Sequence, residues 1–237
     1  MANKANKANK ANKANKVSRV DKANKVKRES KAKRDIRVKN ILDILDTLYP
    51  FDFKCFLDYQ EPWQLLIATI LSAQCTDERV NIVTKTLFKK YPTLADFAAA
   101  DHSTLSEDVR STGFFRMKAK HIIESAGMLL DIPFPSDIET LTALPGVGRK
   151  TANVVRGHIF HIPSIVVDTH VKRCSFKLGL TCHKDPEKIE YELMGVLPKS
   201  HWIAFNQQVI THGRRVCTAR RPNCGDCALV DYCLVRG

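Results

Sequence analysis

A glycine hairpin followed by a helix start most constrains how this chain can fold. It lies in residues 144–155, which read Leu-Pro-Gly-Val-Gly-Arg-Lys-Thr-Ala-Asn-Val-Val. Gly146 and Gly148 allow a tight turn and a close approach of the backbone to another surface. A helix that begins near Arg149 directs free N–H groups at that surface, where they attract phosphate. Lys150 then lies where a nucleophile could meet a molecule anchored by the hairpin.

The basic residues are concentrated at the start of the chain. The 237 residues have a net charge of +13; residues 1–34 carry +11, from 13 basic and 2 acidic residues, which leaves +2 for the rest. Residues 2–16 repeat Ala-Asn-Lys five times, a composition with too little apolar surface to fold. We expect a disordered tail over 1–34 that either attracts phosphate or has no specific role. A mitochondrial transit peptide is less well supported because Lys outnumbers Arg and Ser is scarce.

Apolar residues recur every three or four positions in much of the remaining chain, which is typical of amphipathic helices. The only strand-like run, 164–167, is too short and isolated to build a sheet. We therefore expect an all-α protein of one large or two small domains. The expected helices are 36–48, 63–72, 78–90, 118–130, 149–160, 189–197 and 202–214.

The sequence argues against a membrane protein and against a secreted one. It has no apolar run long enough to span a membrane and no apolar signal-peptide core near its start. Its 8 cysteines are too sparse in 237 residues for a secreted disulfide scaffold, so we expect a reducing compartment. In a bacterium this is the cytoplasm, near the nucleoid; in a eukaryote, the nucleus or mitochondrion.

Four of the cysteines lie within seventeen residues near the C-terminus, at Cys217, Cys224, Cys227 and Cys233. Four thiolates this close can bind a zinc ion or a cubane iron–sulfur cluster, and the spacing alone does not choose between them. The surrounding loop is rich in cations, namely Arg214, Arg215, Arg220 and Arg221. We expect the metal centre to shape this loop for binding phosphate, although a solvated face would explain the arginines as well.

Three segments together resemble the endonuclease III family of DNA glycosylases. The first, residues 66–77, reads Leu-Ile-Ala-Thr-Ile-Leu-Ser-Ala-Gln-Cys-Thr-Asp. The second is the hairpin segment with Val-Val-Asp-Thr-His-Val at 166–171 downstream, and the third is His-Gly-Arg at 212–214 with the four cysteines. The resemblance covers about residues 36–236, which leaves the Ala-Asn-Lys tail without a counterpart.

The resemblance implies two helical domains that flank a DNA-binding cleft. One, over 55–162, holds a helix-hairpin-helix motif, and the other joins 35–54 to 163–237. It implies a [4Fe–4S] cluster bound by the four cysteines, and as partner double-stranded DNA that contains damaged bases or abasic sites. The protein would act as a monomer and would not bind a membrane. Its expected activity is removal of oxidised pyrimidines followed by β-elimination at the abasic site.

The resemblance also assigns catalytic roles. Lys150 would attack the sugar C1′ and form a Schiff base, and we expect burial, together with the neighbouring Arg149 and nearby helix starts, to favour its neutral amine. Asp168 would stabilise positive charge on the sugar or accept a proton from the amine. From the residues alone Asp168 is a favoured helix N-cap, and the two roles are compatible.

Other positions are expected to contact DNA. Gln74 would fill the space left by an extruded base, and Phe114 would enter a base step as an apolar wedge. We expect the segment 113–120, a turn followed by basic residues, to bind a second phosphate. The full set of DNA-binding candidates is Gln74, Phe114, Leu144, Gly146, Gly148, Arg149, Arg214, Arg220 and Arg221.

Two alternative functions remain open at this point. The adenine-removing branch of the same superfamily resembles this chain in its hairpin and cluster. That branch typically lacks the hairpin lysine and has a catalytic glutamate before the glutamine, whereas residues 63–73 here contain no carboxylate. A non-enzymatic helix-hairpin-helix DNA-binding protein would need neither Asp168 nor the cluster.

Overall fold

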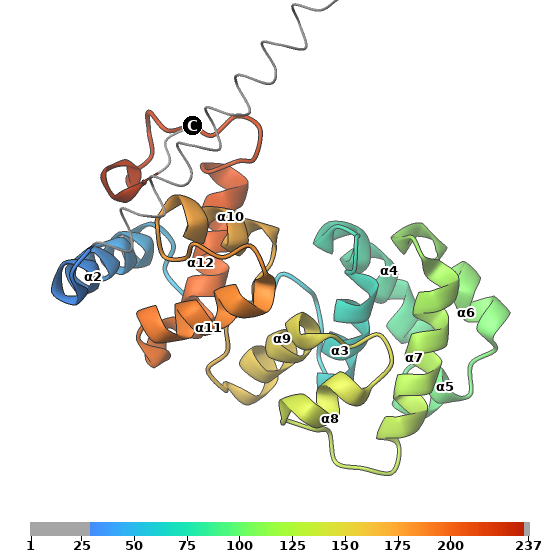
Figure 1. The fold of residues 1–237 in the computed structure, drawn as a ribbon. Helices are drawn as coiled ribbons and strands as arrows, with labels where there is room; N and C mark the ends of the chain where they lie inside the picture. The colour runs from blue at the N-terminus through green and yellow to red at the C-terminus, as the bar shows by residue number, and fades with distance from the viewer. Residues whose placement is uncertain (1–28, 235–237) are drawn as a thin grey trace, which may run out of the picture. The chain divides into compact units, whose positions relative to one another are not determined.

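The computed structural model describes residues 29–234, and these residues form helices and no strands. The all-α prediction is therefore confirmed for this part of the chain (Figure 1). The expected tail over 1–34 lies outside the described residues except for its last six positions. There the structure corrects the prediction, because helix α2 already begins at Lys31. None of the described helices is long and apolar enough to cross a membrane.

The described chain divides into two compact units. Of the described residues, unit 1 combines 29–51 with 167–234, and unit 2 is the continuous segment 52–166. The helices of unit 2 are α3 (Pro62–Leu71), α4 (Asp77–Lys90), α5 (Leu94–Ala98), α6 (His102–Asp108), α7 (Phe115–Leu129), α8 (Ile138–Ala143) and α9 (Arg149–Phe160). Those of unit 1 are α2 (Lys31–Leu48), α10 (Thr169–Lys177), α11 (Pro186–Val196) and α12 (Trp202–Arg215).

Unit 2 is built around helix α3, in which eight consecutive residues, 64–71, are buried. Helices α4, α7 and α9 all pack against α3. Aromatic rings extend this core: Trp63 makes edge contacts with Phe88 and Phe97. The core therefore holds the ends of α3, α7 and α9 in fixed positions, and the candidate site residues of this unit lie at those ends.

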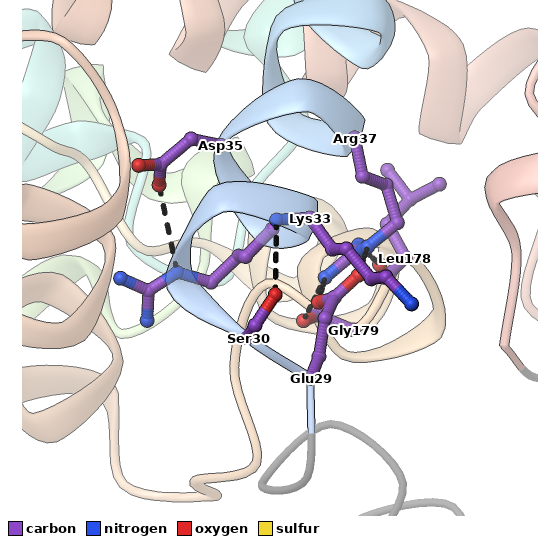
Figure 2. A network of polar contacts seen from close by, with 8 residues as sticks. Glu29, Ser30, Lys33, Asp35, Arg37, Leu178 and Gly179 are labelled. Atoms are coloured by element: carbon purple, nitrogen blue, oxygen red, sulfur yellow. Dashed lines mark hydrogen bonds and ion pairs between the residues drawn. The ribbon is translucent and has the colours of Figure 1, made fainter.

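Unit 1 joins the start of the described chain to its end. Helix α12 packs against both α10 and α2. Ser30 N-caps α2 by accepting a hydrogen bond from the backbone of Lys33. Figure 2 shows how Arg37 on α2 connects Glu29 with the turn after α10: its guanidinium lies 2.9 Å from the Glu29 carboxylate and donates to the carbonyls of Leu178 and Gly179 at 2.6 and 3.3 Å.

Candidate functional site

The glycine hairpin of unit 2 connects α8 to α9, and its apolar residues anchor it. Leu144 and Val147 are buried, and the backbone N–H of Val147 donates to the carbonyl of Leu144 to close the turn. Gly146 has φ +76°, and a Cβ there would lie 2.7 Å from Nδ1 of His121. Glycine is therefore required at 146 by both the backbone conformation and the packing.

Gly148 differs from Gly146, because nothing in the structure requires glycine there. Its φ is −88°, which any residue adopts, and a Cβ would meet no atom within 4 Å. Gly148 is the N-cap of α9, and no side chain caps this helix start. The hairpin thus presents an open backbone at a helix N-terminus, an arrangement that suits phosphate.

Helix α7 supports the hairpin through residues that share one face. His121 packs under Gly146, and the Ser125 hydroxyl donates to the Pro145 carbonyl at 2.8 Å. Lys118 precedes His121 by three residues, so it lies on the same face of the helix. One face of α7 therefore reaches the hairpin and, through Lys118, the two loops that carry Gln74 and Phe114.

Lys118 is buried, with 4% of its surface exposed. Its ammonium donates to the carbonyl of Leu71 at 2.8 Å and to that of Thr112 at 2.7 Å, and burial lowers its pKa. The expectation that segment 113–120 binds phosphate is therefore wrong for Lys118, because its amine is already occupied. Lys118 instead fixes the end of α3 and the turn before α7.

Each of the two loops held by Lys118 carries an exposed side chain, Gln74 or Phe114, on a residue with left-handed backbone conformation. Gln74 follows α3 with φ +55°, and Phe114 precedes α7 with φ +49°. Both are exposed, Phe114 by 67%. A positive φ is uncommon outside glycine, and a large apolar side chain held there in solvent suggests a function rather than a role in packing.

The two predicted catalytic residues lie in different units. Lys150 occupies the first turn of α9 in unit 2, and its side chain is exposed. The expected burial of its amine is therefore wrong for this structure. Asp168 lies in unit 1, half-buried, as the N-cap of α10: its Oδ1 accepts a hydrogen bond from the Val171 N–H at 2.7 Å. The predicted cap is thus confirmed.

The four C-terminal cysteines of unit 1 line a single cavity, together with Cys174 and His212. The structure thus brings together the four thiols that the spacing predicted. Four thiols around one cavity suit either a zinc ion or a cubane iron–sulfur cluster.

Cys174, His212 and Arg173 support the cysteine cavity; His212 belongs to the His-Gly-Arg segment of the resemblance, whereas the sequence did not indicate this role for Cys174 or Arg173. The Cys174 thiol hydrogen-bonds the sulfur of Cys217 and lowers the pKa of that thiol, which favours the thiolate that metal binding needs. His212 places Nε2 3.7 Å from the sulfur of Cys227. Arg173 donates to the Cys217 carbonyl through Nε at 3.0 Å.

The chain positions these supporting residues on helices α10 and α12. Tyr49, at the end of α2, lies with its hydroxyl 3.1 Å from Nδ1 of His212 and so fixes the ring from its other side. At Gly213 a Cβ would lie 2.9 Å from Nδ1 of His170, so glycine is needed for α12 to approach α10 this closely. Arg214 lies in the last turn of α12 and Arg220 and Arg221 lie in the loop that follows it; all three are exposed.

These features define a class of protein: an all-α chain in which a glycine hairpin presents an exposed lysine and four cysteines line a cavity. The comparisons with known families agree with both features. Residues 67–199 match the HhH-GPD superfamily of base excision DNA repair proteins. Residues 217–233 match the iron–sulfur binding domain of endonuclease III.

Individual relatives narrow the class further. The chain is 52% identical to endonuclease III of Synechocystis sp. over 81% of its own length and 90% of the relative's. It is 42% identical to the Bacillus subtilis endonuclease III over 81% and 89%. A trapped endonuclease III–DNA covalent intermediate aligns with a TM-score of 0.79 at 42% identity, over 84% of this chain and 95% of that one.

The chain therefore belongs to the endonuclease III family. The predicted enzyme class, a DNA glycosylase with AP lyase activity in base excision repair, is confirmed at the level of the family. The iron–sulfur match also decides between the two metals that the cysteine spacing left open, in favour of a [4Fe–4S] cluster.

Proposed function

We propose that this protein removes oxidised or ring-saturated pyrimidines, such as thymine glycol, from double-stranded DNA as a monomer and then cleaves the abasic site. The observation that carries the proposal is the hairpin of unit 2, which presents an exposed Lys150 two residues after the uncapped N-terminus of α9. Two similar structures support DNA as the partner, because both are endonuclease III–DNA complexes, one covalent and one not.

Lys150 acts as the nucleophile. Because a base inside a duplex is out of reach, the damaged nucleotide first leaves the stack. The Lys150 amine forms a bond to C1′ while the bond from C1′ to the base breaks, and the base leaves with that electron pair and takes up a proton. The attached amine then loses one proton, and its lone pair forms the C=N bond as the C1′–O4′ bond breaks and O4′ takes up a proton. The resulting protonated Schiff base allows a proton to leave C2′, whereupon the 3′ phosphate departs and the strand breaks.

Asp168 complements Lys150 in this proposal. Its carboxylate stabilises positive charge on the sugar or accepts a proton from the attacking amine, while the same side chain N-caps α10. Lys150 belongs to unit 2 and Asp168 to unit 1. We equate these units with the two domains implied by the family resemblance, so catalysis requires both.

Gln74 and Phe114 stabilise the opened duplex. The exposed Gln74 amide pairs with the base left without a partner, and the exposed Phe114 ring enters the neighbouring base step. Both side chains are held on left-handed backbone beside carbonyls that Lys118 binds. Because Lys118 fixes the backbone on which they stand, the two side chains keep their positions as the duplex deforms, which side chains on a flexible loop would not do.

The hairpin and the arginine loop bind the DNA backbone. Gly146, Gly148 and Arg149 present the start of α9 to a phosphate. The side chain of Leu144 is buried, so its contribution is to hold the hairpin. Cys217, Cys224, Cys227 and Cys233 would hold the cluster, which would supply a rigid core for the loop that carries Arg220 and Arg221. Arg214 lies beside this loop, in the last turn of α12.

Borohydride trapping on a panel of single-lesion duplexes tests the proposed substrate. We expect covalent protein–DNA adducts with thymine glycol and with an abasic site, because only a Schiff base is reduced to a stable amine. We expect none with undamaged DNA or with adenine opposite an oxidised guanine. Adducts with the abasic site but with no oxidised pyrimidine would contradict the lesion class while leaving the lyase step intact.

Replacement of Gly148 by alanine tests the contact between hairpin and phosphate. The added methyl meets no protein atom within 4 Å, so we expect the melting temperature to stay within a few degrees of wild type. Affinity for abasic-site DNA should fall by about 10- to 150-fold, since a lost hydrogen bond to a charged group is worth about 1.5–3 kcal/mol. Gly127→Ala on α7, also in open space, is the matched control. Unchanged affinity of Gly148→Ala would show that DNA does not approach this backbone.

A further inference from the structure

Cys182, His183 and Glu192 of unit 1 form a cluster of ligand-type side chains that the repair activity does not use. Cys182 and His183 lie in the turn between α10 and α11, and Glu192 lies on α11. Their ligand atoms, a sulfur, a ring nitrogen and a carboxylate oxygen, all lie within 4.8 Å of one another. His183 is exposed and the other two are half-buried, so the cluster is open to solvent.

Hydrogen bonds hold this cluster in place. The buried Thr181 hydroxyl donates to Oε2 of Glu192 at 2.5 Å, and the Cys182 N–H donates to the same oxygen at 3.2 Å. The His183 N–H in turn donates to the Thr181 hydroxyl at 3.1 Å. The turn and the carboxylate are thus fixed relative to each other, which is how supporting residues orient metal ligands.

The donor set favours one kind of ion. A thiolate, an imidazole and a carboxylate together suit a borderline-soft divalent ion such as zinc. Magnesium and calcium prefer sites made of oxygen alone. An ion pair between His183 and Glu192, whose atoms lie 3.8 Å apart, would account for two of the three side chains but not for the thiol.

We propose that Cys182, His183 and Glu192 bind one zinc ion, with a fourth position open to water or to another ligand. Three protein ligands and one open position are the arrangement of accessible zinc sites. On binding, the Cys182 thiol releases its proton to solvent as the sulfur–zinc bond forms. The ion ties the turn after α10 to helix α11, and it is held by residues other than the four cysteines of the cluster.

Calorimetric titration of the cluster-loaded, full-length protein with Zn²⁺ tests the proposal. We expect one equivalent to bind, with the visible absorption of the iron–sulfur cluster unchanged and with no competition from excess Mg²⁺. Cys182→Ser and His183→Gln should each weaken this binding by about 100-fold or more, because even the loss of a supporting residue costs 10–100-fold. Glu192 is left intact, since it also holds Thr181 in place.

Cys55→Ser, which removes a half-buried thiol of unit 2, is the control and should bind zinc as wild type does. The exposed position of His183 makes His183→Gln safe for folding, so loss of binding in that variant reports a lost ligand. Three outcomes would overturn the proposal: no uptake of zinc, uptake that neither substitution weakens, or uptake that bleaches the cluster in proportion. The last would place the zinc among the four C-terminal cysteines.

Discussion

The Lys150→Gln variant is expected to lose base release and strand cleavage together, by at least about 1,000-fold in single-turnover rate. Loss of a nucleophile removes a covalent path that the remaining groups cannot replace, and 1,000-fold corresponds to about 4 kcal/mol of transition-state stabilisation. Because Lys150 is exposed at the start of α9, its replacement disturbs no packing. Single-turnover assays on a thymine glycol duplex, with binding measured on the same DNA, check both rate and affinity.

A matched variant separates the chemistry of Lys150 from its charge. Lys85→Gln removes one exposed lysine from α4 and should leave the rate unchanged. Affinity of Lys150→Gln for the duplex should stay within a few-fold of that of Lys85→Gln. If Lys150→Gln kept its cleavage activity, the amine would be only a phosphate contact, as in a non-enzymatic hairpin protein.

Local sequence signals predicted the bounds of helix α9. Helix α9 begins at Arg149 and ends at Phe160, as the hairpin glycine and the apolar spacing predict. Helix α2 starts five residues earlier than predicted because Ser30 caps it, and that serine lies within a basic stretch that we assigned to the tail. The basic composition of this stretch led us to assign it to the tail, and the capping residue Ser30 within it was therefore missed.

Tertiary contacts explain what the sequence could not show in the candidate site. Lys118 follows a loop and resembles a phosphate ligand, yet its amine binds two carbonyls from segments up to 47 residues away. Cys174 is isolated in the sequence but reaches Cys217 because α10 packs against α12. Spacing reveals ligands that are neighbours in the chain, such as the four C-terminal cysteines, and misses those that only the fold brings close.

The two roles of Asp168 can be separated by replacing it with asparagine. An asparagine Oδ1 can accept the hydrogen bond that the Val171 N–H now donates to the carboxylate, and Asn and Asp are about equally good N-caps. Loss of the charge at the start of α10 costs about 0.3–1 kcal/mol, which lowers the melting temperature by about 2–4 °C at most. The rate should nevertheless fall by at least about 100-fold, since an acid–base group contributes about 10²–10⁴.

Asp185→Asn is the control, because Asp185 N-caps α11 in the same unit through the same kind of contact, a 3.0 Å hydrogen bond from the Lys188 N–H. Both variants should melt at nearly the same temperature, and only Asp168→Asn should lose glycosylase and lyase rates. Equal rates in the two variants would show that Asp168 only caps helix α10 and takes no part in catalysis. A rate loss confined to Asp168→Asn requires a negative charge at this helix start, as expected of a group that stabilises a cationic sugar or takes a proton from Lys150.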